Sequence, residues 1–246
     1  MSTTMPPRRD DLVKLNIIHE FDRVLAIANL RGCYGRIAER FYSRMIRDVK
    51  GTRILDAGCG FGQFSSCCVA RGLSVHSVDI DERSLAVARD VYQLKCFNES
   101  TYQTSLPDNS IDTVVSNDAI CHFDIERFLC ETRRLGAQRI IVHDSNIENP
   151  FLVANRRLMR HEEYRSYSAF DVVNLFQASG YKCVKLDFVN FLSLPISGGF
   201  QRRPLPVVSR FPAFVYAIDS IIARALTVFA ARQKLAFRFV AVFERA

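Results

Sequence analysis

The chain has 246 residues, 48% of them hydrophobic and 24% charged, with a formal net charge of +7. This length and composition exclude a disordered or fibrous chain and allow one α/β domain with a full hydrophobic core. Residues 1–10 contain no apolar run behind their charges, so we expect no secretory signal and a cytoplasmic protein. The eight cysteines include no C-x-x-C pair, which predicts reduced core residues and no metal site.

Residues 10–50 are predicted to be helical. Apolar side chains from Tyr34 to Ile46 recur at the i, i+3, i+4 spacing of an amphipathic helix. Such a helix buries one side, so packing is the default role of its aromatic residues.

A strand, a glycine-rich loop and a helix are predicted between residues 53 and 71. The strand ends in Asp56, and glycine then stands at every second position. Glycine can adopt φ > 0 and lets a ligand lie directly against the backbone. Gln63 begins the helix and occupies the position where a dinucleotide-binding fingerprint needs its third glycine. The segment therefore predicts a nucleotide-type ligand site that differs from that fingerprint.

A second strand, residues 73–79, also ends in an acidic residue. Asp79 follows Gly58 by 21 residues. A carboxylate about 20 residues after such glycines accepts hydrogen bonds from ribose hydroxyls in sheets of this kind. Residues 81–89 should form the next helix, with acidic side chains in its first turn.

These two segments resemble a known family. The D-x-G-x-G-x-G loop of residues 56–62 resembles motif I of class I S-adenosylmethionine (SAM) methyltransferases, and "VDIDERSLAVAR" resembles their post-I region. The resemblance implies SAM as cofactor, with Asp79 at its ribose and Ile80 beside it. N-terminal helices often cover the pocket in this family, so Phe21, Tyr34 or Arg36 could touch the ligand. The resemblance also implies that the methionine side of SAM lies against residues of the loop: Asp56, Gly58, Cys59, Gly60 and Gly62.

Residues 95–98 form a weak third strand, and residues 101–117 resemble the family segment that leads into the fourth. Many members carry an acid there that meets the adenine amino group, whereas this chain has Tyr102 or Gln103. We expect one of these two residues at the adenine, and Asn117, at the end of the fourth strand, also in the cofactor site.

Candidate catalytic residues follow the fourth and fifth strands, which a helix over residues 125–135 connects. Both strands end at the carboxyl edge of the sheet, where open α/β sheets bind ligands. His122 stands where many small-molecule members of the family have a histidine, and an imidazole can accept a hydroxyl proton near neutral pH. A structural hydrogen bond is an equal alternative for His122. His143 and Asp144, at the end of the fifth strand, share the alternative role of base.

The remaining core elements are a helix over residues 168–179, a strand over 181–190 and a last strand over 237–245. In the family, that last strand inserts antiparallel between the fifth and sixth. The predicted fold is α/β: a doubly wound, seven-stranded, mostly parallel Rossmann-like sheet. We expect one domain, with a helical cap (1–50), a core (51–190 and 236–246) and a helical insertion (191–235).

The insertion is the least familiar segment. Prolines and glycines from Pro195 to Pro212 predict irregular structure, and residues 214–231 read as a largely apolar helix. Residues 191–246 carry eight basic side chains, Arg202 and Arg203 among them, against two acidic ones. The helix could pack on the core or form a homodimer face, act as a substrate lid, or contact an anionic membrane through residues 202–232.

The resemblance implies transfer of a methyl group from SAM to an oxygen or nitrogen of a small-molecule acceptor. Family members that act on nucleic-acid bases usually show [DNS]-P-P-[YF] after the fourth strand, and residues 116–119 contain no proline. Nucleic acid is therefore disfavoured as a partner. Two alternatives remain open: a peripheral-membrane methyltransferase acting on a lipid or lipid-linked glycan, and a non-catalytic SAM-binding partner protein.

Overall fold

A computed structural model of the chain describes residues 23–158, 167–197, 207, 210–226 and 229–246. Phe21, Arg202 and Arg203, which the sequence singled out, lie outside the described residues. The predicted cap and insertion are therefore described only in part.

The described strands form one seven-stranded sheet in the order β3-β2-β1-β4-β5-β7-β6. All pairs are parallel except those that β7 makes with β5 and β6. The predicted fold class is thereby confirmed, including the antiparallel insertion of the last strand. The strands are β1 (Arg53–Ala57), β2 (Ser74–Asp79), β3 (Cys96–Asn98), β4 (Thr113–Asn117), β5 (Arg139–Ser145), β6 (Tyr181–Val189) and β7 (Arg238–Arg245).

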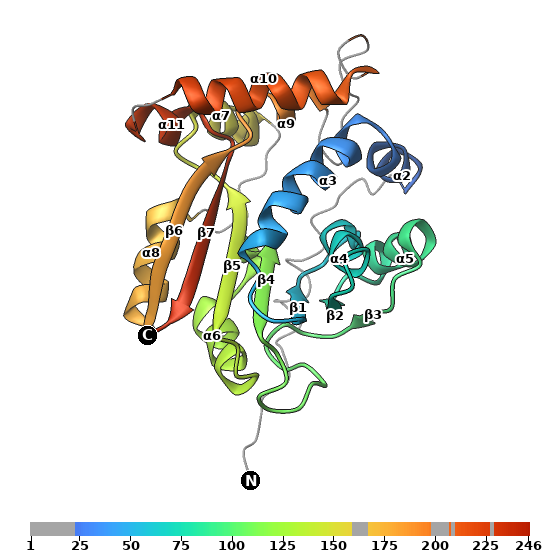
Figure 1. Ribbon diagram of the computed structural model, residues 1–246, viewed down its shortest axis with the longest axis vertical. Helices are drawn as coiled ribbons and strands as arrows, with labels where there is room; N and C mark the ends of the chain where they lie inside the picture. Colours follow the sequence, from blue (N-terminus) through green and yellow to red (C-terminus); the bar gives the residue numbers. More distant parts are fainter. Residues whose placement is uncertain (1–22, 159–166, 198–206, 208–209, 227–228) are drawn as a thin grey trace.

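Helices cover both faces of this sheet (Figure 1). The helices are α2 (Arg23–Arg31), α3 (Cys33–Met45), α4 (Gln63–Val69), α5 (Glu82–Tyr92), α6 (Ile125–Arg134), α7 (Pro150–Leu158), α8 (Ala169–Ala178), α9 (Ser193–Ser197), α10 (Pro212–Ala225) and α11 (Phe229–Leu235), with short 3-10 helices η1 (Ile46–Asp48) and η2 (Ile120–His122). One apolar core joins α6 and α8 to the sheet, and a second joins α3 and α4 to the opposite face.

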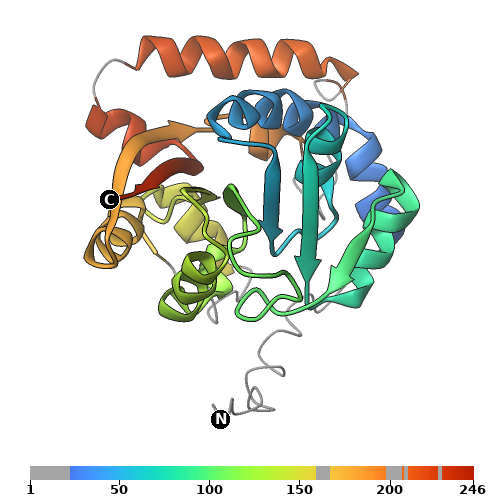
Figure 2. The ribbon, with the colours of Figure 1, turned by 60° about the horizontal axis from the view of Figure 1, so that its bottom comes forward.

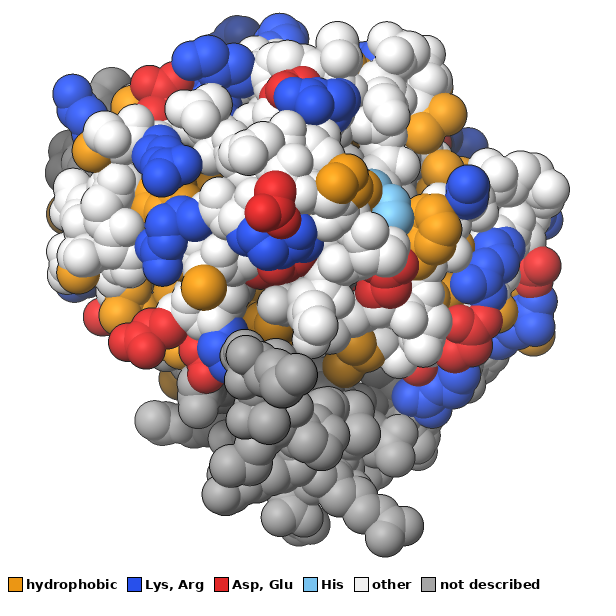
Figure 3. All heavy atoms as spheres, turned by 90° about the horizontal axis from the view of Figure 1, so that it is seen from below, with side chains coloured by type: hydrophobic (Ala, Val, Ile, Leu, Met, Phe, Trp, Pro, Cys, Tyr) orange, Lys and Arg blue, Asp and Glu red, His pale blue; other side chains and the backbone are white. Residues whose placement is uncertain are grey.

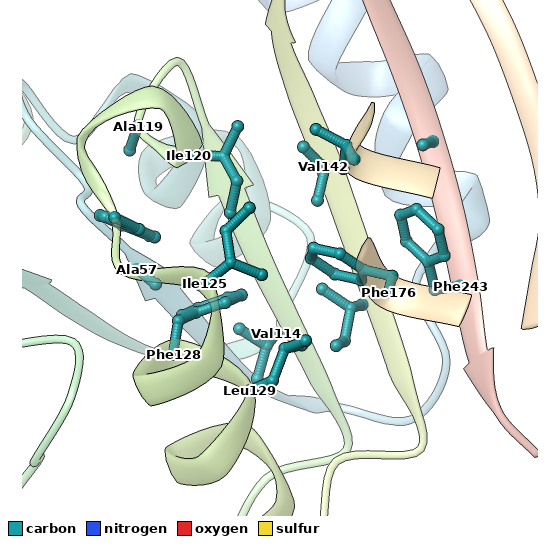
Figure 4. Close-up of a cluster of buried hydrophobic side chains, with 14 of the residues drawn as sticks. Ala57, Val114, Ala119, Ile120, Ile125, Phe128, Leu129, Val142, Phe176 and Phe243 are labelled. Atoms are coloured by element: carbon teal, nitrogen blue, oxygen red, sulfur yellow. The ribbon is translucent and has the colours of Figure 1, made fainter. Parts of the chain in front are cut away.

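The core beneath α6 and α8 is built from large side chains without exposed surface. Phe128 and Leu129 of α6 and Phe176 of α8 pack against Val114 and Val142 of the central strands (Figure 4). Strands covered on both faces must be apolar in both directions, which explains why β4 and β5 read as apolar runs rather than alternating patterns.

The described part of the predicted insertion contains three helices, α9, α10 and α11, between β6 and β7. It therefore lies at the carboxyl edge of the parallel strands, because β6 ends and β7 begins there. Figures 1 and 2 show α10 crossing this end of the molecule, where it contacts α3 and α9. Among the described residues no helix is long and apolar enough to cross a membrane.

Two local expectations were wrong, and one helix had no prediction. The helix predicted over 214–231 begins at Pro212. It ends at Ala225, and a separate helix, α11, begins at Phe229. Pro212 occupies the first turn, where its missing N–H costs no hydrogen bond. Pro195 lies inside the short helix α9 rather than in irregular chain, and α7 was not predicted at all.

Candidate functional site

The glycine loop after β1 is tied to the end of β2. The N–H groups of Gly58 and Cys59 both donate to the carbonyl of Val78, each at 2.9 Å. Gly58 has φ +72°, and a Cβ at this position would lie 2.7 Å from Cβ of Ala119 and 3.2 Å from the Phe123 ring. The segment after β4 therefore packs directly on the loop, and only glycine fits there.

Gly60, by contrast, faces open space. Its φ is +50°, and a Cβ would meet nothing within 4 Å. Its N–H donates to Oδ2 of Asp79 at 2.8 Å, while Oδ1 of Asp79 accepts the N–H of Asp81 at 2.9 Å. Each carboxylate oxygen can accept a second hydrogen bond, so Asp79 keeps acceptor capacity beside the open side of the loop.

Asp56 supports the loop from within the core. It is completely buried, and its Oδ2 accepts the Ser65 hydroxyl at 2.5 Å, which in turn lies 2.7 Å from the Ser77 hydroxyl. Its Oδ1 has no hydrogen-bond partner among the described residues. Burial, reinforced by the nearby charge of Asp79, raises the pKa of Asp56 to about 7, against the donation from Ser65 that lowers it.

The other predicted cofactor residues lie around the loop. Ile80 is 40% exposed just beyond Asp79, and Cys59 packs toward the α5 side. Burial raises the pKa of the Cys59 thiol well above its usual value, so the sulfur is protonated and inert. Gly62, with φ +72°, begins α4.

Of the two predicted adenine contacts, Tyr102 is better anchored than Gln103. The Tyr102 hydroxyl accepts the N–H of Asp124 at 2.8 Å, and its ring packs edge-on against Phe123. Because Phe123 also lies against Gly58, the Tyr102 ring is one side chain away from the loop. Gln103 is exposed in the tight turn that follows β3.

Asn117 takes part in a buried hydrogen-bond chain with residues of β5 and α3. Its amide nitrogen donates to the Tyr42 hydroxyl at 3.0 Å, and its carbonyl oxygen lies 2.6 Å from Nδ1 of His143. This arrangement assigns the proton to Nδ1 of His143, since the amide oxygen can only accept. The Phe41 ring lies over His143, with centroids 4.6 Å apart.

An ion pair closes the same edge of the sheet. Arg238, the first residue of β7, lies 2.8 Å from Asp118, which follows β4 with φ +55°. Burial disfavours the charged guanidinium, but Asp118, Tyr34, Tyr42 and Asp144 together outweigh that cost and raise the pKa of Arg238. Burial and the charge of Asp118 raise the pKa of Asp144, on the adjacent strand, to about 7.

The three predicted catalytic residues do not meet in one cluster. His122 is exposed on η2, whereas His143 and Asp144 are buried. Consecutive strand residues point to opposite faces: His143 packs against α3, and Asp144 accepts the N–H of Cys121 in η2 at 3.3 Å. Burial and the charge of Arg238 lower the pKa of His143 well below its usual value, so its imidazole is neutral.

Sequence reasoning missed Arg238 and Tyr42. Both line a small cavity of about 20 Å³, together with Tyr34, Phe41 and Asn190. One signal was available for Arg238: it is followed by five apolar residues (239–243) in a strand predicted to lie inside the sheet, where a charge needs a buried partner. Its partner, Asp118, could not be read from the chain, because 119 intervening residues separate the two positions.

Comparison with known proteins agrees with this geometry. Residues 55–139 match the family model described as a methyltransferase domain. A probable S-adenosylmethionine-dependent methyltransferase of Mycobacterium tuberculosis is 30% identical over 131 residues, which are 51% of this chain and 47% of that protein. The chain thus spans about half the length of the curated relatives it matches.

Solved structures share the fold. A SAM-dependent methyltransferase from Archaeoglobus fulgidus superposes with a TM-score of 0.61 at 18% identity, covering 85% of this chain and 94% of that one. Magnesium protoporphyrin IX methyltransferase from Synechocystis, solved with bound SAH, gives 0.60 at 13% identity, covering 96% and 100%.

The chain is therefore similar to SAM-dependent methyltransferases, in sequence over residues 55–139 and in fold over most of its length. In this chain the glycine loop, Asp79 and Tyr102 lie on the side of β1 and β2, which we call the loop half. A largely buried polar cluster lies at the ends of β4, β5 and β7, and we call it the strand-end half: Tyr42, Asn117, Asp118, His143, Asp144 and Arg238.

Proposed function

We propose that this methyltransferase binds SAM against the loop half and transfers its methyl group to a small-molecule acceptor. The observation that carries the proposal is the open side of Gly60 next to the Asp79 carboxylate. A ligand can approach the backbone there without meeting a side chain, and Asp79 can accept from its hydroxyls. The residues present therefore fit an adenosyl ligand.

Each loop-half residue has a separate task in this proposal. Gly60 lets the ligand lie on the backbone, and Gly58 lets the segment after β4 pack on the loop. Asp79 accepts the ribose hydroxyls, and Tyr102 or Gln103 faces the adenine. Asp56 fixes the loop through its bond to Ser65 in α4. SAM supplies a methyl group on a sulfonium, so its leaving group is already activated.

The acceptor then needs orientation and, if it is a hydroxyl, a base. Holding reactants in near-attack geometry contributes roughly 7–11 kcal/mol, which is the task of residues lining the adjoining strand-end half. Among the candidates, we assign the base role to His122, because it is exposed on the segment whose residues Ala119 and Phe123 pack on Gly58. His143 and Asp144 are buried. Two proteins of the same fold support a small acceptor, since one is named as a magnesium protoporphyrin IX methyltransferase and the other as a geranyl diphosphate methyltransferase.

Calorimetry with SAM and its demethylated product SAH tests the binding step. Asp79→Ala should weaken binding at least tenfold, equivalent to about 1.4 kcal/mol, because the ribose hydroxyls lose their acceptor. Glu82→Gln is the matched control: it removes a carboxylate three residues away that is paired with Arg89 on the surface. Equal affinity in the wild type and Asp79→Ala would remove Asp79 from the site.

Methyl-labelled SAM tests the transfer step. The protein is incubated with labelled SAM and fractionated cell extract, and we expect label in a polar, low-molecular-weight fraction. Label in a polymer would refute the small-molecule acceptor. SAM binding without transfer to any fraction would instead indicate a non-catalytic SAM-binding protein.

A further inference from the structure

The outer face of α10 exposes large apolar side chains. Phe214 is 58% exposed, Ile221 is 61% exposed, and Phe211, just before the helix, is 60% exposed. Ala217 and Ala225 are also exposed and lie at the intervening helical positions, so the apolar stripe is continuous along the helix. A stripe of this kind on a surface helix marks a contact with something outside the chain.

The rotation of α10 about its axis is fixed, so this exposure is a property of the fold. Asp219, on the opposite side of the helix, is buried. Its Oδ1 accepts three backbone N–H groups at the start of α9, from Phe191 at 3.0 Å, Leu192 at 2.6 Å and Ser193 at 2.8 Å. Val215 packs on the same side against α3. Turning the stripe inward would break all three hydrogen bonds.

The charges around the stripe have one sign. Arg210, Arg224 and Lys234 are exposed on the described part of the insertion, and its one acidic residue, Asp219, is buried. The opposite end of the molecule differs: Figure 3 shows Lys and Arg side chains interspersed there with Asp and Glu. The insertion therefore presents aromatic and aliphatic side chains flanked by cations alone, the composition of helices that lie in a membrane interface.

We propose that the outer face of α10 docks on an anionic phospholipid bilayer. Apolar side chains enter the acyl boundary, and the cations meet lipid phosphates. A second copy of this chain fits less well, because a two-fold interface would bring the same cations of both copies together. The docked face lies at the carboxyl edge of the sheet, above α9 and α3. If the proposed function holds, an amphipathic acceptor could thus enter the strand-end half from the bilayer.

Vesicle flotation with the full chain tests this docking. The protein should float with vesicles containing phosphatidylglycerol and stay at the bottom with pure phosphatidylcholine. Raising the salt to about 1 M, where the screening length is about 3 Å, should release most of it. Failure to float with the anionic vesicles would overturn the proposal.

Two variants separate the contributions of the stripe. Phe214→Asp with Ile221→Asp should reduce the bound fraction at least tenfold, while Val24→Asp with Val69→Asp, at exposed apolar positions of α2 and α4, should bind as wild type does. Arg210→Ala with Arg224→Ala keeps the apolar stripe and should weaken binding about tenfold. Equal flotation of the wild type and both α10 variants would contradict the proposal.

Sedimentation and SAH calorimetry on the same samples distinguish the remaining outcomes. A dimer that Phe214→Asp with Ile221→Asp dissociates, and that does not float, would make α10 a self-association face and overturn membrane docking. SAH affinity should be unchanged in every α10 variant. Loss of docking with intact SAH binding therefore refutes this inference alone, whereas absent SAH binding in the wild type refutes the proposed function alone.

Discussion

The loop half and the strand-end half are built in opposite ways. The loop half comes mainly from one stretch of chain, β1 to the start of α5. Its contacts join residues of that stretch, such as Gly60 and Asp79, which are 19 positions apart. The strand-end half joins Tyr42, Asn117, His143 and Arg238 from four separate elements. The first can bind its ligand through backbone shape, while the second depends on every strand being in register.

The two halves should therefore respond differently to substitution. A substitution of Gly60 or Asp79 in the loop half should change ligand affinity with little effect on folding, because these two residues border the open side of the loop. A substitution in the strand-end half should change stability, because its polar groups are largely buried and are hydrogen-bonded or ion-paired with one another. The following predictions test that contrast.

Arg238→Met should produce the largest effect. It leaves the Asp118 carboxylate without its ion-pair partner at the buried edge, and breaking a buried pair costs about 3–5 kcal/mol. Chemical denaturation measures the loss. Adding Asp118→Asn should restore part of the stability, since no unpaired charge then remains.

Arg53→Met is the matched control for Arg238→Met. It removes an ion pair with Asp112 in which the Arg53 side chain is 51% exposed, so the cost should be clearly smaller. SAM affinity should stay unchanged in both variants. Equal losses of unfolding free energy in Arg238→Met and Arg53→Met would show that the strand-end ion pair stabilises the protein no more than the exposed pair does.

His122→Ala should lower the turnover number about 100-fold, the lower range for loss of a general base, without changing SAM affinity or stability. His143→Ala should instead lower the melting temperature, because it removes the partner of Asn117 and leaves space beneath Phe41. Steady-state kinetics and thermal unfolding of both variants separate the roles. An unchanged turnover number in His122→Ala would exclude it as the base.

Asp56→Asn should have the smallest effect, seen only in the pH dependence of stability. Folding raises the pKa of Asp56 to about 7, so the folded state favours the protonated acid. This contribution is present below the unfolded pKa of about 3.9 and is lost as pH rises to 7. Above pH 7, Asp56→Asn, which resembles the protonated form, should be more stable than wild type by about 1–3 kcal/mol. A difference in melting temperature between Asp56→Asn and wild type that stays constant from pH 4 to 8 would contradict the raised pKa of Asp56.

The sequence predicted most of the fold because its signals are local. Strand β1 and its glycines, Ser168 as the cap of α8 and Gly180 after it all express backbone preferences within a few residues. The insertion was predicted less well. Its helices are placed by Asp219, whose three acceptor bonds reach residues 26–28 positions away, and no pattern within the insertion reports them.

The sequence alone determined the seven-stranded sheet and the loop half. Their signals, glycine conformations and a strand-end carboxylate, are carried by residues close to one another along the chain. Only the tertiary structure decided the fate of the strand ends. Alternation along β5 sends His143 and Asp144 to opposite faces, and the insertion of β7 brings Arg238 to Asp118. Burial and ion pairing depend on which strands become neighbours, a choice made by the packing of the whole sheet.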